Sequence, residues 1–126
     1  MSFGGQDLES LRYPIGRFLL DPEATADKRA GWITAIEELP SRMREAVSDL
    51  RDDQLDTPYR DGGWTVRQLV HHVADSHTNA YVRLKLTLTE TRPSVKGYDE
   101  KAWAELPDAR MPVDVSLALL DALHAR

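Results

Sequence analysis

The residues best suited to chemistry are three histidines that follow a glycine-containing turn in the middle of the chain. His71, His72 and His77 fall within about two turns of a helix that is expected to begin at Thr65. Imidazole is a common metal ligand and also the side chain that most readily changes charge near neutral pH. Asp75 lies among them and could orient an imidazole through a hydrogen bond. Residue types alone leave two alternatives open, a metal ligand or a hydrogen-bonded core histidine.

A long helix, beginning after Thr65 and ending at about Thr89, must position these histidines. Gly62 and Gly63 predict a turn before the helix, because glycine tolerates backbone conformations that other residues avoid. Thr65 and Gln68 have the spacing of a capping box, in which each side chain bonds the other residue's backbone amide. The same sequence contains no proline or glycine that would end the helix early.

Projecting this helix at about 100° per residue separates its histidines. The apolar side chains fall on one broad face, and His77 lies inside that face. His72 projects to a flank of the helix with Asp75 beside it, whereas His71 points elsewhere and is expected to be solvated. Periodicity alone therefore makes His77 the buried imidazole, and a buried histidine is more often a core residue than a ligand.

Length and composition restrict the possible classes of protein. The chain has 126 residues, enough for one domain with a core. Its 16 Lys and Arg against 21 Asp and Glu give a formal net charge of −5, which argues against binding nucleic-acid phosphates. The absence of cysteine excludes thiolate ligands, so a metal would need imidazole, carboxylate or water. No membrane-spanning run or signal peptide is recognisable, and a cytoplasmic location is expected.

Three other segments have helical patterns. Residues 26–50 carry apolar side chains at spacings of three and four, and Pro40 predicts a kink or break among them. Asp99 is expected to cap a short helix that ends before Pro107, and residues 114–126 are helical again. No segment has the pattern of a strand. The sequence therefore predicts an all-α, up-and-down helical bundle.

The N-terminal stretch precedes these helices and lacks their periodicity. Glycines and prolines interrupt residues 1–25, and residues 1–12 are expected to form a flexible arm ahead of a helical domain over residues 13–126. The stretch from Leu11 to Leu19 is nevertheless too apolar for a free tail. We expect its apolar side chains to pack across the domain.

Four stretches of the sequence together resemble one family. They are Tyr13-Pro14-Ile15-Gly16, Leu55 to Gln68, His71 to His77 and Tyr98 to Trp103. On these residues the chain, from about Tyr13 to its last residue, is similar to the YfiT-like branch of the DinB superfamily. That branch is named for metal-dependent hydrolysis and is related to the bacillithiol transferases.

The resemblance implies a DinB-like four-helix bundle that holds one divalent metal ion, zinc or nickel, per subunit on three histidines. His72 matches the family's ligand on the second helix, and the other two ligands form an H-x-x-x-H pair on the last long helix. His124 does not match that pair. The chain is therefore expected to lack the last helix of the bundle and to carry one ligand of three. Asp75 and His77 would then orient the imidazole or line the pocket.

The resemblance also implies an enzyme, either a metal-dependent hydrolase or a transferase that joins a low-molecular-weight thiol to an electrophile. A three-histidine metal suits both reactions, because it can activate water or a thiol. We prefer thiol transfer for the complete protein and assign no further catalytic residue. The alternative is a metal-free helical interaction module or an inactive fragment. The expected partners are a small-molecule substrate and a second copy in a homodimer, with no nucleic acid and no membrane.

Overall fold

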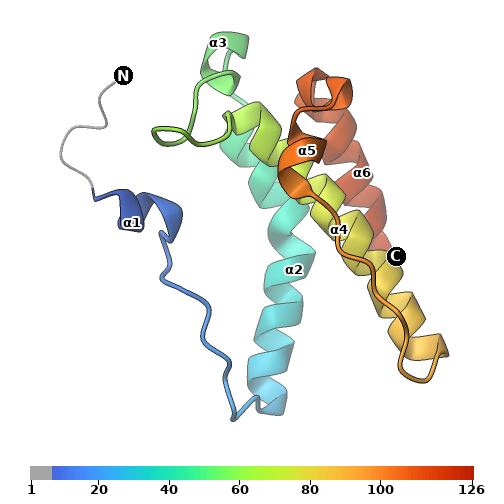
Figure 1. The fold of residues 1–126 in the computed structure, drawn as a ribbon. Helices are drawn as coiled ribbons and strands as arrows, with labels where there is room; N and C mark the ends of the chain where they lie inside the picture. Colours follow the sequence, from blue (N-terminus) through green and yellow to red (C-terminus); the bar gives the residue numbers. More distant parts are fainter. Residues whose placement is uncertain (1–6) are drawn as a thin grey trace.

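The computed structural model describes residues 7–126, and over these residues the chain is all-α (Figure 1). The helices in chain order are α1 (Leu8–Arg12), α2 (Ala26–Val47), α3 (Asp52–Leu55), α4 (Val66–Thr89), α5 (Glu100–Ala104), the 3-10 helix η1 (Pro107–Arg110) and α6 (Val113–Ala125). No strand occurs in the described residues, where an isolated antiparallel bridge joins Pro58 to Thr65. The prediction of an all-α fold is confirmed.

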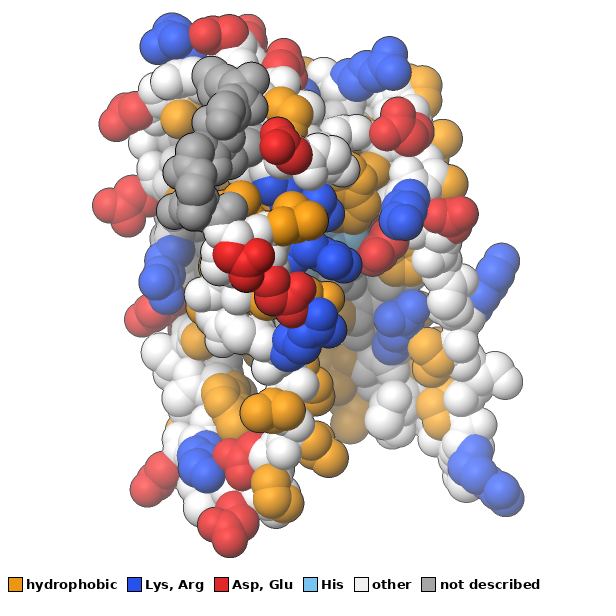
Figure 2. Space-filling view, turned by 60° about the vertical axis from the view of Figure 1, so that its left-hand side comes forward, with side chains coloured by type: hydrophobic (Ala, Val, Ile, Leu, Met, Phe, Trp, Pro, Cys, Tyr) orange, Lys and Arg blue, Asp and Glu red, His pale blue; other side chains and the backbone are white. Residues whose placement is uncertain are grey.

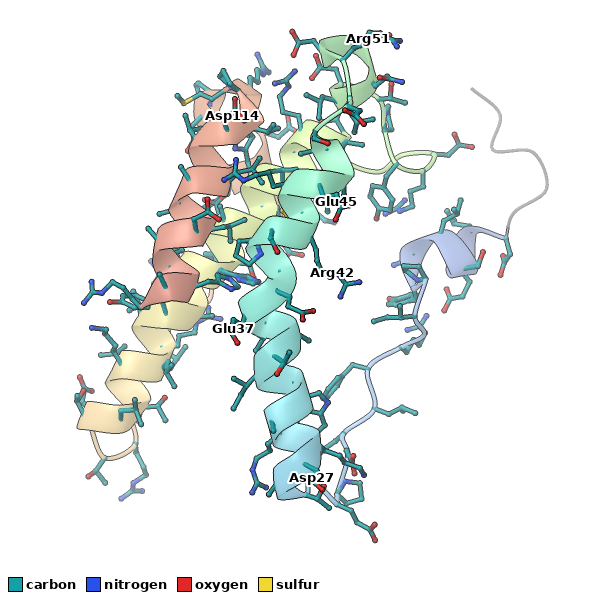
Figure 3. The ribbon with its side chains drawn as sticks, turned by 180° about the vertical axis from the view of Figure 1, so that it is seen from behind. Asp27, Glu37, Arg42, Glu45, Arg51 and Asp114 are labelled. Atoms are coloured by element: carbon teal, nitrogen blue, oxygen red, sulfur yellow. The ribbon has the colours of Figure 1, made fainter. Side chains whose placement is uncertain are left out.

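Helix α6 is the central packing element, although it comes last in the sequence. It packs against both α2 and α4, whereas α2 and α4 make few direct contacts and diverge toward their far ends (Figure 1; Figure 3). The side chain of Leu120, on α6, is completely buried. The buried residues that cluster where these helices meet α3 are Val47, Leu55, Val70, Val113 and Leu117.

Local sequence fixes the beginning of α4 as predicted. The Gln68 amide donates to Thr65 Oγ1 at 3.1 Å, and the Thr65 amide donates to Gln68 Oε1 at 3.0 Å. This reciprocal capping box satisfies two of the backbone donors that a helix start leaves free. The helix then continues without interruption to Thr89, the end that the sequence predicted.

Helix α2 differs from its prediction in the middle. It is one continuous helix from Ala26 to Val47, so no break occurs at Pro40. The Pro40 ring is buried, and this burial offsets the single backbone hydrogen bond that proline removes. Thr25 caps the helix by accepting from the Lys28 amide at 3.3 Å.

The N-terminal stretch does not pack as predicted. Ile15, Phe18 and Leu19 are 98%, 86% and 84% exposed, and α1 contains no buried residue. In both ribbon views the chain between α1 and α2 stands away from the helices (Figure 1; Figure 3). The prediction that these residues cross the domain is wrong, because apolar composition does not specify the surface that would receive them. The part of the predicted arm before residue 7 lies outside the described residues.

The far halves of α2 and α4 also leave apolar side chains uncovered. On α2 these are Trp32, Ile33 and Ile36, and on α4 they are Leu84 and Leu88. Figure 2 shows hydrophobic side chains gathered over the lower part of one face. None of the helices formed by residues 7–126 has both the length and the apolar composition of a membrane span.

Candidate functional site

Among the histidines of α4, His72 is the one whose ring nitrogens remain free. It is half-buried, and its ring lies against Trp64 with 4.6 Å between the ring centroids and 49° between the planes. Among residues 7–126, neither of its ring nitrogens has a hydrogen-bond partner. An imidazole that is held by an aromatic contact, with both nitrogens available, is suited to act as a ligand.

The described residues contain no closed metal site. Across residues 7–126, no group of three His, Asp or Glu side chains could hold one ion together. Protein zinc sites use three or four protein ligands. His72 therefore fits one position of a coordination sphere, and the other positions need donors that this part of the chain does not provide.

His71, which the helical projection placed in solvent, is buried. Its Nδ1 lies 2.6 Å from Ser116 Oγ, and its Nε2 lies 2.8 Å from the Met111 carbonyl oxygen. Because a carbonyl can only accept, the neutral ring carries its hydrogen on Nε2, and Nδ1 accepts from the Ser116 hydroxyl. The prediction of a solvated His71 is wrong because its partners, the Met111 carbonyl just before α6 and Ser116 on α6, lie far away in the sequence. These bonds occupy both nitrogens and join α4 to α6.

His77 forms part of a link between three helices. Its Nδ1 lies 2.6 Å from His124 Nε2, and the two rings are stacked with centroids 4.8 Å apart. His124 Nδ1 in turn lies 2.6 Å from the Ile36 carbonyl oxygen on α2. The helical projection made His77 the buried imidazole, but the buried imidazole of α4 is His71, and His77 is half-buried with its ring engaged with α6. The sequence carried no signal for this pair beyond the residue types.

The His77 link makes stability depend on pH. Burial lowers the pKa of His77 below its usual value of 6.5, and the neighbouring His124 lowers it further. The unfolded chain therefore takes up this proton at a higher pH than the folded chain. The resulting stability is fully present above about pH 6.5 and is lost as the pH falls through the folded-state pKa. We expect the free energy of unfolding, measured in urea, to fall between about pH 8 and about pH 5.

Replacing His77 with asparagine tests this origin of the pH dependence. The variant His77→Asn removes the titrating ring from α4, so its free energy of unfolding is expected to change less over the same pH range. An unchanged slope in the variant would assign the pH dependence to other groups.

Asp75 lies near the histidines without binding them. Together with His71, Ser116 and Asp108 it lines a cavity of about 220 Å³. Burial raises the pKa of the Asp75 carboxyl, Asp108 raises it further, and His72 and His71 oppose the change. No hydrogen bond joins Asp75 to either imidazole within the described chain. Asp75 therefore influences His72 through charge, and its role in orienting a ligand stays a prediction.

Backbone hydrogen bonds and two glycines fix the loop that places Trp64 against His72. The Tyr59 amide donates to the Trp64 carbonyl at 3.1 Å, and the Gly63 amide donates to the Arg60 carbonyl at 3.0 Å. A Cβ atom at Gly63 would lie only 2.7 Å from Arg60 Cγ, so glycine is needed for the close approach. Gly62 has φ of +66°, which also favours glycine. The loop fixes Trp64, and Trp64 fixes the side on which His72 is packed.

Arg67 is a second polar feature at the start of α4, and its role is structural. The guanidinium donates to Asp56 at 2.7 Å, to Asp52 at 2.9 Å and to the Met111 carbonyl at 3.3 Å. The hydrogen bonds to these two carboxylates raise the pKa of Arg67. Arg67 is buried and its charge is balanced by these carboxylates, so Arg67 is not available to a ligand in the cavity of about 570 Å³ beside it. Asp52, on α3, thereby joins α3 to α4.

This geometry defines a class of protein, a helical bundle whose long helix α4 presents one free imidazole. The sequence pattern of the DinB superfamily matches residues 35–126. The solved structure of YfiT from Bacillus subtilis aligns with a TM-score of 0.89 and 52% identity, covering 93% of this chain and 67% of that chain. It is described as "a probable metal-dependent hydrolase with an unusual four-helix bundle topology". The chain belongs to the DinB superfamily.

Proteins of two Bacillus species are similar over the same length. One from Bacillus cereus strain B4264, named "putative metal-dependent hydrolase", is 56% identical over 119 residues, which are 94% of this chain and 69% of the relative. One from Bacillus anthracis strain A0248 has the same name, identity and coverage. Both relatives therefore contain sequence beyond the part that aligns with this chain.

Proposed function

We propose that this protein is a metal-dependent hydrolase or transferase of the YfiT type, in which His72 is one of the metal ligands. The observation that carries the proposal is the state of the imidazoles on α4. His71 and His77 are each engaged with α6, whereas His72 has both nitrogens free beside Trp64. The fold shared with YfiT, and the names of the relatives, supply the reaction class.

The residues of this chain have distinct tasks in the proposed site. The His71 bonds to Ser116 on α6 and to the Met111 carbonyl just before α6 fix the register of α4, and Trp64 holds the His72 ring from the loop that precedes α4. A divalent ion, zinc or nickel, supplies Lewis-acid activation of a nucleophile when it is bound. The remaining ligands would come from donors outside residues 7–126 or from a partner chain.

Between the two reactions, we favour transfer of a low-molecular-weight thiol over hydrolysis. Attack by water benefits from a positioned general base, and no residue among residues 7–126 is assigned that role. A thiol needs less help, because its pKa is much lower than that of water. The chain contains no cysteine, so the sulfur would belong to the cosubstrate.

A second candidate function is that of a metal-free helical interaction module. It is favoured by the apolar side chains left uncovered on the far halves of α2 and α4, such as Trp32 and Leu88. The same side chains support a homodimer as part of the main proposal, because contiguous apolar surface usually marks an interface. A small-molecule substrate and a cytoplasmic location complete the proposal.

Metal content separates the two candidates. Untagged protein in a form that supplies the remaining ligands, purified without chelator or metal-affinity resin, is expected to contain about one divalent ion per chain by elemental mass spectrometry. The His72 site needs that ion, whereas the interaction module does not. Protein that lacks metal, and fails to take up zinc or nickel during dialysis, would overturn the enzyme proposal in favour of the module.

A further inference from the structure

A cavity of about 650 Å³ lies between the N-terminal stretch, the loop before α4, and α5. Its volume is typical of pockets that hold small molecules. Three aromatic rings contribute to its wall, those of Tyr13, Tyr59 and Trp64. Three cationic side chains also line it, those of Arg12, Arg60 and Lys101. None of these cations has a role in the proposed metal site at His72.

Arg60 is held in a fixed position inside this cavity. Its Nε donates to the Tyr59 hydroxyl at 2.9 Å, and its Nη1 donates to the Asp61 carbonyl at 3.0 Å. The missing Cβ of Gly63 leaves the space that the Arg60 stem occupies. Within residues 7–126 the Nη2 group has no hydrogen-bond partner. A guanidinium held in this way loses little side-chain entropy when it binds an anion.

The charge of Arg60 is unbalanced, unlike that of Arg67. Arg67 forms ion pairs with two carboxylates, whereas no carboxylate within the described residues forms an ion pair with Arg60 or Lys101. Two carboxylates also line the cavity, those of Glu100 and Glu105, so its three cations are in excess. The positive charge of the cavity lining is opposite in sign to the formal net charge of the whole chain, which is −5.

The cavity is separated from His72 by a single aromatic ring. Trp64 lines the cavity, and the same ring lies 4.6 Å from the His72 ring, measured between centroids. Figure 2 shows a histidine inside a hollow on the surface, with Lys and Arg side chains around it. A molecule seated in the cavity could therefore extend past Trp64 toward His72.

We propose that this cavity binds a carboxylate group of the small-molecule substrate, with Arg60 as its principal donor and Lys101 as a second cation. The planar guanidinium matches the two oxygens of a carboxylate, and charge-assisted hydrogen bonds of this kind are the strong ones. Tyr59 and Trp64 contact the carbon skeleton. The inference deepens the proposed function, because it assigns a substrate class to the His72 site.

Binding of succinate to ¹⁵N-labelled protein tests the proposal. Titration is expected to shift the amide signals of Gly62 and Gly63 and the indole signal of Trp64 in a saturable manner. The neutral isostere succinamide is expected to leave them unchanged. Arg60→Gln is expected to weaken succinate binding about tenfold, because it removes one charge-assisted contact. Lys101→Gln, an exposed position, is expected to weaken binding without affecting folding.

Arg92→Gln is the matched control. Arg92 follows the far end of α4, is exposed, and loses the same charge on substitution. It is expected to bind succinate like the original protein. Equal binding by Arg60→Gln, equal shifts with succinamide, or no succinate binding would each overturn the carboxylate site. Binding of inorganic phosphate as tightly as succinate would replace it with a general anion site.

The same titration, repeated after metal removal, separates this inference from the metal proposal. Succinate binding that is lost in protein retaining its metal refutes the cavity assignment and leaves His72 untouched. Succinate binding that persists after metal removal supports the carboxylate site and leaves the His72 assignment to the metal measurement, whereas protein that takes up no metal but still binds succinate refutes the metal proposal alone.

Discussion

In the complete form of the protein, which supplies the remaining ligands, replacing His72 with alanine is expected to lower bound divalent metal from about one ion per chain to almost none, while helical content stays the same. The imidazole has both nitrogens free, and its contact with Trp64 is the main packing that the substitution removes. A site with three or four protein ligands loses most of its affinity when one is missing, because each ligand contributes directly to the metal's coordination. Elemental mass spectrometry and far-UV circular dichroism measure the two quantities.

His77→Ala is the matched control for this experiment. His77 is on the same helix and is also half-buried, but its ring is engaged with His124 rather than free. Its replacement is expected to lower stability and to leave metal content near one ion per chain. Normal metal content in His72→Ala, or loss of metal in His77→Ala alone, would show that the ligand assignment is wrong.

Replacing Leu120 with alanine is expected to lower the free energy of unfolding by about 2–5 kcal/mol. Leu120 is 0% exposed and lies on α6, the helix that packs against both α2 and α4. Because two separate helices form the walls of its site, they cannot easily close together over the space left by the lost methyl groups. Urea unfolding followed by circular dichroism measures the change.

Leu119→Ala provides the comparison, since it removes the same atoms one position earlier on the same helix. Leu119 is 43% exposed, and its replacement is expected to cost less than about 1 kcal/mol. A similar loss in both variants would attribute the effect to helix formation rather than to core packing. A small loss in Leu120→Ala would contradict the central role of α6.

Local signals in the sequence predicted the elements that local interactions control. The spacing of Thr65 and Gln68 predicted the start of α4, and the two residues form the predicted capping box. Asp99 predicted the start of α5, and its side chain accepts a hydrogen bond from the Ala102 amide at 3.0 Å. In each case both partners are within three residues, so neither contact depends on how the helices are arranged.

The errors concern contacts between distant residues. His71 was expected in solvent, but Ser116 and the Met111 carbonyl, more than 35 residues later, bury it. A projection of one helix includes no neighbouring helix, so it cannot identify such partners. The exposed side chains near Phe18 show the opposite error, since the sequence indicates hydrophobicity without indicating what covers it.

The sequence predicted the candidate site only in part. His72 was selected by resemblance to a family, because the projection favoured His77 instead, and its role as a ligand remains a prediction. The structure adds the reason that His72 is available while its neighbours are not. Only the three-dimensional arrangement brings Tyr59 and Arg60 to one cavity with Lys101.

The central position of α6 has a consequence for the order in which the chain folds. Helices α2 and α4 leave the ribosome first, yet they make few contacts with each other. Contacts of α6 with α2 join residues as far apart as Ile36 and His124, so a long loop must close before they form. A nascent chain that ends before Val113 has helices but no core. Productive folding therefore waits until the segment that joins the two earlier helices has been synthesised.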